Sequence, residues 1–503
     1  MTIHTSICLL AVAGVIPPNL NPWKNPRHPL PQYVIDRKSN MGPQNKEEMY
    51  RDLAAFPKPA SELVWPKENP WVKTPRGSVV VHAKSFGWNP DDGTEALEKA
   101  LQSDAKTVII DKMEKPWRVK TLHPTGDKTI VLERGVHIIG TKESQLSGSM
   151  GDMFALNRVK NIFLVGRGDN YVGRYTETEE TGRNVNGKYG GIGVGIGNSE
   201  NIAIKNITFA NNGMDGACLG GDYRPAHNIW FEDCVFDRNT RQGVSIISAD
   251  GVYFKNCTFS RTCGLAPKCG LDIEPWLPQN NASANIYIFG CTFEDNRGGH
   301  LQFSTASIWP VTVYVKDCLF KAHGLAAIGI TQRVLYPEYQ TDAPSDVIFE
   351  NCRIEARRGV VPVRFDEGNF FHTTFRGGEI VEVGGGSKPS AAPFFFRLNR
   401  EFRMEKDNSP VPRPVPEGSL VFDNVKITGY NSTDKLMWLE DTAKLCTVTS
   451  LYGTVIHNGK KTDMAQFRYP GPQEDLKDKG KGKGKSKDRS RDRSRDRKGR
   501  NRK

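Results

Sequence analysis

Two carboxylates stand two residues apart in the segment GLDIEPW, at Asp272 and Glu274. In an extended strand, residues two apart project to the same face, with their Cβ atoms about 6.5–7 Å apart. A carboxylate pair on this scale suits acid and base catalysis of glycosidic-bond cleavage, because inverting glycosidases hold their two carboxyls about 6.5–9.5 Å apart. The sequence therefore predicts an acid/base pair at Asp272 and Glu274.

Short segments that begin with glycine recur on either side of this pair. We align them at Gly243, Gly270 and Gly298, as if each glycine opened the same strand of a successive repeat. The alignment predicts two columns of neighbouring side chains, which are Ser245, Asp272 and His300 in one, and Ile247, Glu274 and Gln302 in the other.

Two further catalytic candidates follow from this alignment. His300 is expected one repeat away from Asp272, within interaction distance. Asp215, in GMDGACL, occupies the position that Gln242 takes one repeat later, and it adds a third carboxylate. The predicted catalytic residues are Asp272, Glu274, Asp215 and His300.

Basic, amide and aromatic side chains flank these acids. Three basic residues precede the aligned glycines and are expected to hold an anionic sugar, because guanidinium and ammonium groups bind carboxylates. Trp276 follows the acid pair and offers a surface on which a sugar ring can stack. The predicted substrate-binding residues are Arg241, Gln242, Lys268, Trp276, Arg297 and Gln302. No metal site and no cofactor are predicted, since no Cys/His cluster has zinc spacing. Calcium is expected as a cofactor only if the enzyme is a lyase.

A repeated template accounts for how these residues would be positioned. Each copy alternates apolar and polar residues over four positions, as a half-buried strand does. A polar pair, a small apolar residue, a polar residue and a large apolar residue follow. The residue before the small apolar one is always Asn, Asp or Gly, types that tolerate a left-handed backbone, so each copy predicts strand, bend, strand. The copies are NIAIKNITF (201–209), NIWFEDCVF (228–236), GVYFKNCTF (251–259), NIYIFGCTF (285–293), TVYVKDCLF (312–320), DVIFENCRI (346–354) and SLVFDNVKI (419–427).

Stacked copies would place identical positions above one another, about 4.8 Å apart. The small apolar position then forms an inward column that five cysteines share with one Ile and one Val, so its thiols are predicted to act as small hydrophobes. Its members are Ile207, Cys234, Cys257, Cys291, Cys318, Cys352 and Val425. Cys263 and Cys269 share one loop, where a local disulfide stays open.

A second stretch, VVVHAKSFGWNPDDGTEALEKALQSDAKTVIID at Val79–Asp111, predicts a strand followed by a short amphipathic helix. Asp92 or Thr94 can cap the start of this helix. Its apolar stripe would cover the open end of a stacked coil, which otherwise exposes strand edges. The stripe consists of Ala96, Leu97, Ala100 and Leu101.

The repeats and this opening segment resemble the right-handed parallel β-helix of the pectate-lyase-like superfamily, most nearly its uncharacterised bacterial repeat proteins, over about Val79 to Gly453. The predicted fold is all-β, a single solenoid with an N-terminal capping helix. A leucine-rich horseshoe is the rival, but the chain uses Ile, Val and Phe and adds a second glycine-led strand. The resemblance implies activity on carbohydrate without naming it, because this architecture hosts hydrolases, lyases, epimerases and viral adhesins. The polygalacturonase and alginate-epimerase motifs are absent from the sequence.

Charge separates the body of the chain from its end. The chain carries Lys+Arg 69 and Asp+Glu 57, a net charge of +12. Residues 476–503 contain 15 basic and 4 acidic side chains, so the body is nearly neutral at +1, which argues against a folded nucleic-acid-binding surface. We predict a possible short signal segment at 1–16, a Pro/Trp-rich arm at 17–76, a strand and capping helix at 77–112, the β-helix at 113–455, a closing segment at 456–475 and a disordered basic tail at 476–503.

These observations together predict a polysaccharide-cleaving enzyme, and hydrolysis is favoured over elimination. It is expected to be a monomer that is secreted, periplasmic or on the cell surface, with no membrane span and no specific nucleic-acid partner, and its tail would contact anionic glycan or the cell surface. A lyase would use His300 or Lys268 as its base on a uronate glycan. A non-catalytic glycan-binding or adhesion solenoid and a structural protein tethered by the tail stay open as alternatives.

Overall fold

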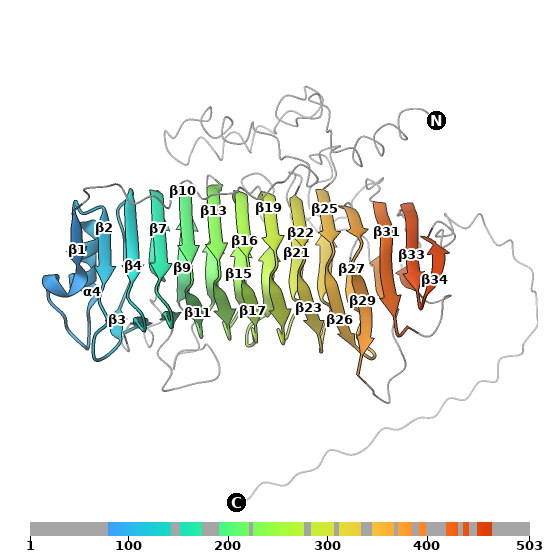
Figure 1. Ribbon diagram of the computed structural model, residues 1–503, viewed down its shortest axis with the longest axis horizontal. Helices are drawn as coiled ribbons and strands as arrows, with labels where there is room; N and C mark the ends of the chain where they lie inside the picture. The colour runs from blue at the N-terminus through green and yellow to red at the C-terminus, as the bar shows by residue number, and fades with distance from the viewer. Residues whose placement is uncertain are drawn as a thin grey trace, which may run out of the picture.

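The computed structural model describes residues 79–141, 151–173, 191–220, 225–275, 283–305, 311–332, 345–366, 371–384, 392–398, 419–430, 436–441 and 450–464. These residues form an elongated stack of short strands, which runs from β1 and the helix α4 at one end to β34 at the other (Figure 1). The predicted signal segment, arm and tail lie outside the described residues.

The larger sheet has 24 strands, which contain the two halves of the repeated template. Strands before the bend pair with strands before the bend in the next coil, and strands after it do likewise. The strands are β1 (Val80–His82), β2 (Thr107–Ile110), β3 (Trp117–Val119), β4 (Lys128–Leu132), β5 (His137–Gly140), β7 (Lys160–Gly166), β8 (Tyr171–Gly173), β10 (Glu200–Lys205), β11 (Thr208–Ala210), β13 (Ala226–Glu232), β14 (Val235–Asp237), β16 (Ala249–Lys255), β17 (Thr258–Ser260), β19 (Ser283–Phe289), β20 (Thr292–Glu294), β22 (Thr312–Lys316), β23 (Leu319–Ala322), β25 (Ser345–Glu350), β26 (Arg353–Arg357), β28 (Phe371–Arg376), β29 (Glu379–Val383), β31 (Ser419–Thr428), β33 (Ser450–His457) and β34 (Lys460–Asp463).

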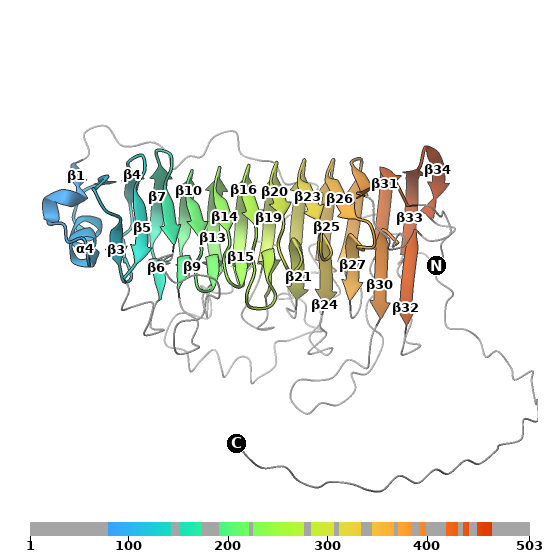
Figure 2. The same ribbon diagram turned by 90° about the horizontal axis from the view of Figure 1, so that it is seen from below.

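A second sheet of ten strands contains the glycine-led segments, and its strands lie side by side along the stack in Figure 2. Adjacent strands of both sheets are parallel, except that β34 pairs antiparallel with β33 at the last coil. The strands are β6 (Asp152–Asn157), β9 (Ile192–Gly197), β12 (Asp215–Leu219), β15 (Gln242–Ile246), β18 (Cys269–Ile273), β21 (Leu301–Thr305), β24 (Ile328–Gln332), β27 (Val363–Asp366), β30 (Phe394–Leu398) and β32 (Met437–Asp441).

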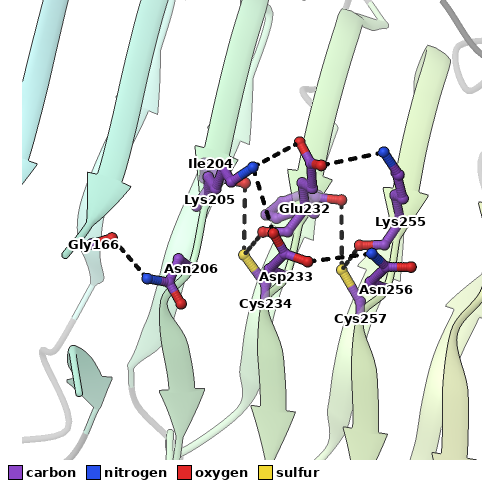
Figure 3. A network of polar contacts seen from close by, with 11 residues as sticks. Gly166, Ile204, Lys205, Asn206, Glu232, Asp233, Cys234, Lys255, Asn256 and Cys257 are labelled. Atoms are coloured by element: carbon purple, nitrogen blue, oxygen red, sulfur yellow. Dashed lines mark hydrogen bonds and ion pairs between the residues drawn. The ribbon is translucent and has the colours of Figure 1, made fainter. Parts of the chain in front are cut away.

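The bend within each template is left-handed, as the Asn, Asp and Gly residues predict. All seven residues at this position have φ between 52° and 61°, from Asn206 to Asn424. Figure 3 shows three of them in successive coils, where Asn256 donates to Asp233 at 3.3 Å and Asn206 donates to the carbonyl of Gly166 at 2.8 Å. A short polar side chain at this position therefore supplies both the backbone geometry and a contact to the coil beside it.

The column of small apolar residues after the bend faces the core, as predicted. Its five cysteines are buried and free, and they belong to one hydrophobic cluster that also contains Ile207 and Val425. Each thiol contacts backbone carbonyl oxygens; Cys234 Sγ, for example, lies 3.4 Å from the carbonyl of Glu232 (Figure 3). Cys263 and Cys269 are free as well, so the local disulfide is not formed.

Stacked side chains hold successive coils in register. Five phenylalanine rings, two positions after the small apolar column, stack with centroids 4.6–5.6 Å apart, in the order Phe209, Phe236, Phe259, Phe293 and Phe320. On the outer face, Glu232 lies 3.3 Å from Lys205 on one side and 3.3 Å from Lys255 on the other. Aromatic pairs of this geometry contribute about 0.5–1.5 kcal/mol each beyond their buried area, whereas exposed ion pairs contribute less.

The N-terminal end is covered by the 3₁₀ helix η4 (Ala83–Phe86) and by α4 (Thr94–Gln102). The predicted stripe of α4 is buried against Trp117 in the main core. Asp92 Oδ1 accepts hydrogen bonds from the backbone N–H and hydroxyl of Thr94, so the carboxylate stands at the helix start. Among the described residues, no helix is long and apolar enough to cross a membrane.

Candidate active site

The strand β18 presents Asp272 on the outer face of the ten-stranded sheet. Its neighbours Leu271 and Ile273 belong to the hydrophobic core, so the alternation of the strand directs Asp272 away from it. Asp272 pairs with Ser245 in the preceding coil and with Gln302 in the following coil. The outer position predicted for Asp272 is therefore consistent with the structure, although the side chain is 0% exposed.

The amide of Gln242 bridges the two carboxylates that the sequence predicts as a pair. Its Nε2 donates to Asp272 Oδ2 at 2.6 Å and lies 3.5 Å from Glu274 Oε2. The two carboxylate oxygens are therefore no more than 6.1 Å apart, the sum of these distances. Glu274 is half-buried, whereas Asp272 and Gln242 are fully buried.

Burial sets the protonation of Asp272. Loss of solvent and then the negative charges of Glu274 and Asp215 raise its pKa well above the usual value, against the opposing charge of Arg241. Its Oδ1 atom is buried without a hydrogen-bond partner among the described residues, and so are Gln242 Oε1 and Ser245 Oγ. Burial thus favours the neutral form of Asp272, and three buried polar atoms here, one of them its own Oδ1, have unused hydrogen-bonding capacity.

Asp215 and Arg241 form a bidentate ion pair next to this group. Arg241 Nε lies 2.9 Å from Asp215 Oδ1, and Nη2 lies 2.5 Å from Oδ2. Burial raises the pKa of Asp215, and the Arg241 guanidinium opposes this rise. The expected alignment of Asp215 with Gln242 is confirmed by the pairing of β12 with β15. The sequence predicts that Arg241 holds an anionic sugar. In the structure, its Nε and Nη2 atoms are instead paired with Asp215.

A fourth carboxylate, Asp152 on β6, was missed by the sequence reasoning. It lies over Gly195 of β9, where a Cβ atom would stand 1.8 Å from Asp152 Oδ2. Gly195 in turn pairs with Cys218 of β12. Burial and then the charge of Asp215 raise the pKa of Asp152 to about 6. The run GGIGVGIG could have signalled this residue, because a glycine such as Gly195 leaves room for a neighbour's carboxylate.

The predicted position of His300 is wrong. Leu271 pairs with Leu301, so His300 is level with Gly270 and Gln302 takes the place beside Asp272. His300 lies seven residues after Phe293, as Gly216 lies seven after Phe209, but Gly270 lies eleven after Phe259, so neither this spacing nor the nearest glycine marks the start of every strand.

The His300 side chain packs inside the fold and contacts structural groups rather than the acid pair. Its Nε2 lies 2.7 Å from the Lys321 carbonyl and its Nδ1 lies 3.0 Å from Asn296 Nδ2. The ring is 2% exposed, and burial lowers its pKa to about 4. It is therefore neutral near pH 7 and does not contact Asp272.

The remaining predicted binding residues are spread around the pair. Gln302 belongs to the column of Asp272 rather than that of Glu274, and its Nε2 donates to Ser304 Oγ at 2.7 Å. Lys268 is half-buried and its carbonyl accepts from Gly298 N at 2.7 Å, whereas Arg297 is exposed. Trp276 lies outside the described residues.

A separate group of potential metal ligands occurs at the N-terminal end, where atoms of His82, Asp111 and Glu133 lie within 4.8 Å of one another. Asp111 already contacts His82 Nδ1 at 2.7 Å and the Lys84 ammonium at 3.1 Å. The Lys84 ammonium therefore already balances the charge of Asp111.

Comparison with known proteins agrees with this architecture. Residues 174–335 match a family model described as "Right handed beta helix region". The protein is a right-handed parallel β-helix. No curated protein sequence matches the chain.

Solved structures with a similar fold share little sequence with this β-helix. Polygalacturonase from Erwinia carotovora ssp. carotovora is 13% identical with a TM-score of 0.47, covering 77% of this chain and 99% of its own. Endo-xylogalacturonan hydrolase from Aspergillus tubingensis is 11% identical with a TM-score of 0.40, covering 74% of this chain and 99% of its own. The A-module of a mannuronan C-5 epimerase from Azotobacter vinelandii is 13% identical with a TM-score of 0.40, covering 75% and 98%. At these identities, the similarity concerns the fold alone.

Proposed function

We propose that the protein cleaves a polysaccharide by hydrolysis, with Asp272 and Glu274 as its catalytic pair. The observation that carries this proposal is the contrast between two neighbouring carboxyls. Asp272 is fully buried with a raised pKa, whereas Glu274, on the same face, is partly open to solvent. Neighbouring carboxyls in different environments can divide the acid and base roles of glycoside hydrolysis.

The reaction needs one proton and one base. Burial and then the negative charge of Glu274 raise the pKa of Asp272, so we assign the proton of the resting site to Asp272. During cleavage, one carboxyl donates this proton to the glycosidic oxygen as its bond to the anomeric carbon breaks. The other, ionised carboxyl assists attack at that carbon, and water supplies the hydroxyl of the new reducing end while its remaining proton returns to the carboxyl pair. The Gln242 amide must turn away from Asp272 Oδ2 for a sugar oxygen to reach it.

Elimination is the weaker alternative for this site. A lyase needs an unprotonated base near the proton beside a uronate and a cation to neutralise the uronate. Both nitrogens of His300 are engaged by Asn296 and Lys321, and Arg241 is paired with Asp215. Of the two bases predicted for this route, only Lys268 then stays a candidate.

The test is cleavage of a broad panel of plant, algal and bacterial polysaccharides by the purified full chain, with products identified by mass. Hydrolysis gives new reducing ends without the ultraviolet absorbance of an unsaturated sugar. Asp272→Asn and Glu274→Gln are expected to lower kcat by about 10²-fold or more, the range for loss of a general acid or base.

Asp317→Asn is the matched control. Asp317 is an exposed bend residue of the other sheet, and Asn occupies the same bend at Asn256 and Asn351. Full activity in both site variants would remove the assignment of the pair. Products that absorb in the ultraviolet would replace hydrolysis by elimination, and tight glycan binding without any product would replace the enzyme by a binding solenoid.

A further inference from the structure

The charged groups around the proposed catalytic pair are mostly acidic. Asp152, Asp215 and Glu274 join Asp272 on the outer face of the ten-stranded sheet, and Asp215 and Glu274 are the negative charges that act most strongly on Asp272. Asp152 is coupled to the group through Asp215. The one cation among the leading influences on Asp272 is Arg241.

The Arg241 guanidinium is already paired with a carboxylate of the protein. Asp215 is 0% exposed and takes both Nε and Nη2 of Arg241, so the two charges neutralise each other. Lys268 and Arg297 are not among the leading charges that act on Asp272, and His300 is turned toward Asn296 and Lys321. Among the described residues, Arg241 is thus the cation with a leading influence on Asp272, and it is already paired.

The unused hydrogen-bonding atoms of the site point to the same kind of ligand. Asp272 Oδ1 and Gln242 Oε1 are buried oxygens without a partner among the described residues, and Ser245 Oγ is a third. Gln242 Oε1 can only accept, whereas Asp272 Oδ1 carries the proton of the neutral carboxyl because Oδ2 already accepts from Gln242. Buried polar atoms left unpaired are costly, so a ligand whose groups both donate and accept is favoured. Sugar hydroxyls donate hydrogen bonds, whereas an ionised carboxylate only accepts them.

We therefore propose that the glycan bound at Asp272 and Glu274 is neutral and hydroxyl-rich, and that it is not a polyuronate. This inference rests on the proposed function and names its substrate class. A uronate at this site would bring a further negative charge next to Glu274, while Arg241, the cation that acts most on Asp272, is already paired with Asp215. A neutral sugar avoids this cost.

The test compares acidic polysaccharides with their carboxyl-reduced forms, in which each uronic acid has become the corresponding neutral sugar. The backbone and linkages are the same within each pair, so charge is the variable. The full chain is incubated with both members, and binding is measured by affinity electrophoresis beside cleavage. We expect neutral polysaccharides, or the reduced member of a pair, to be preferred by about tenfold or more in kcat/KM and in binding.

A variant tests whether negative charge near the site causes the preference for neutral polysaccharides. Asp152→Asn removes one negative charge from the edge of the site and is expected to strengthen binding of the native acidic polymer, with little change for its reduced form. Asp169→Asn, at an exposed residue of the other sheet, is the control and should change neither.

The outcomes separate this inference from the proposed function. Cleavage of an acidic polymer that is lost on carboxyl reduction would overturn the neutral substrate and leave hydrolysis standing. Binding of neutral polymers without cleavage would overturn hydrolysis and leave the charge preference standing. Neither binding nor cleavage of any member would overturn both.

Discussion

Replacing Asp152 by Asn is expected to stabilise the protein near neutral pH. The unfolded chain ionises this carboxyl near its ordinary pKa of 3.8, whereas the folded protein keeps it protonated until about 6. The contribution of Asp152 to stability is therefore highest below pH 3.8, falls between pH 3.8 and about 6 as only the unfolded state loses a proton, and is level above that. Asn has nearly the same shape and cannot ionise, so the variant avoids this loss.

The magnitude follows from the shift. A change from 3.8 to about 6 corresponds to about 3 kcal/mol at 1.36 kcal/mol per pKa unit, and partial access of solvent reduces this to about 2–3 kcal/mol. Urea unfolding followed by circular dichroism at pH 3.5, 5, 7 and 8 measures the difference. We expect a gain of about 2–3 kcal/mol for Asp152→Asn at pH 7 and almost none at pH 3.5.

Asp169→Asn is the matched control. Asp169 is exposed, lies 3.6 Å from Arg134, and has φ of 53°, which Asn adopts readily. It should change stability by less than about 0.5 kcal/mol at every pH. Identical pH profiles for wild type and Asp152→Asn, or a less stable variant at pH 7, would refute the assignment of a buried, protonated Asp152.

Three further changes test other parts of the structure. Arg241→Met leaves Asp215 buried without its partner and should lower the free energy of unfolding by about 3 kcal/mol at pH 8. Adding Asp215→Asn should recover most of this loss, and an equal loss in the double variant would contradict the pairing. Asn239→Ala removes a buried side chain that accepts from Asn212 and donates to the Phe209 carbonyl, and urea unfolding should show a loss of about 2–4 kcal/mol. Cys257→Val should lower the free energy of unfolding by less than about 1.5 kcal/mol, because Ile and Val occupy the same column in other coils. Cys257→Ser buries a hydroxyl and should lower it more. The reverse order would show that the thiol is not a packing group.

The fold could be predicted from the sequence because its signals are local and repeated. The bend needs a residue that tolerates a left-handed backbone, and Asn, Asp or Gly stands there in each copy. The inward cysteine column and the buried stripe of α4 follow from the same kind of pattern, since alternation along a strand or helix decides which side chains face the core. The outer position of Asp272 was accessible by the same reasoning.

The details of the site depended on contacts between coils. His300 was misplaced because the turns differ in length from coil to coil: Gly243 and Gly270 are each the second residue of a strand, whereas Gly298 stands before its strand, which begins at Leu301. The distance from the preceding phenylalanine varies as well, from seven residues between Phe293 and His300 to eleven between Phe259 and Gly270, so only the pairing of the coils sets the register.

Side-chain direction within a strand is a short-range property, and the order of residue types along this chain was sufficient to determine it. Which side chains contact one another is a long-range property. Asp215 meets Arg241, and Gln242 bridges Asp272 and Glu274, across 26 to 32 positions of sequence. Only the lateral stacking of coils decided which acid is neutralised, which keeps its proton and which oxygens stay unpaired, because burial and electrostatic coupling depend on distances in space rather than along the chain.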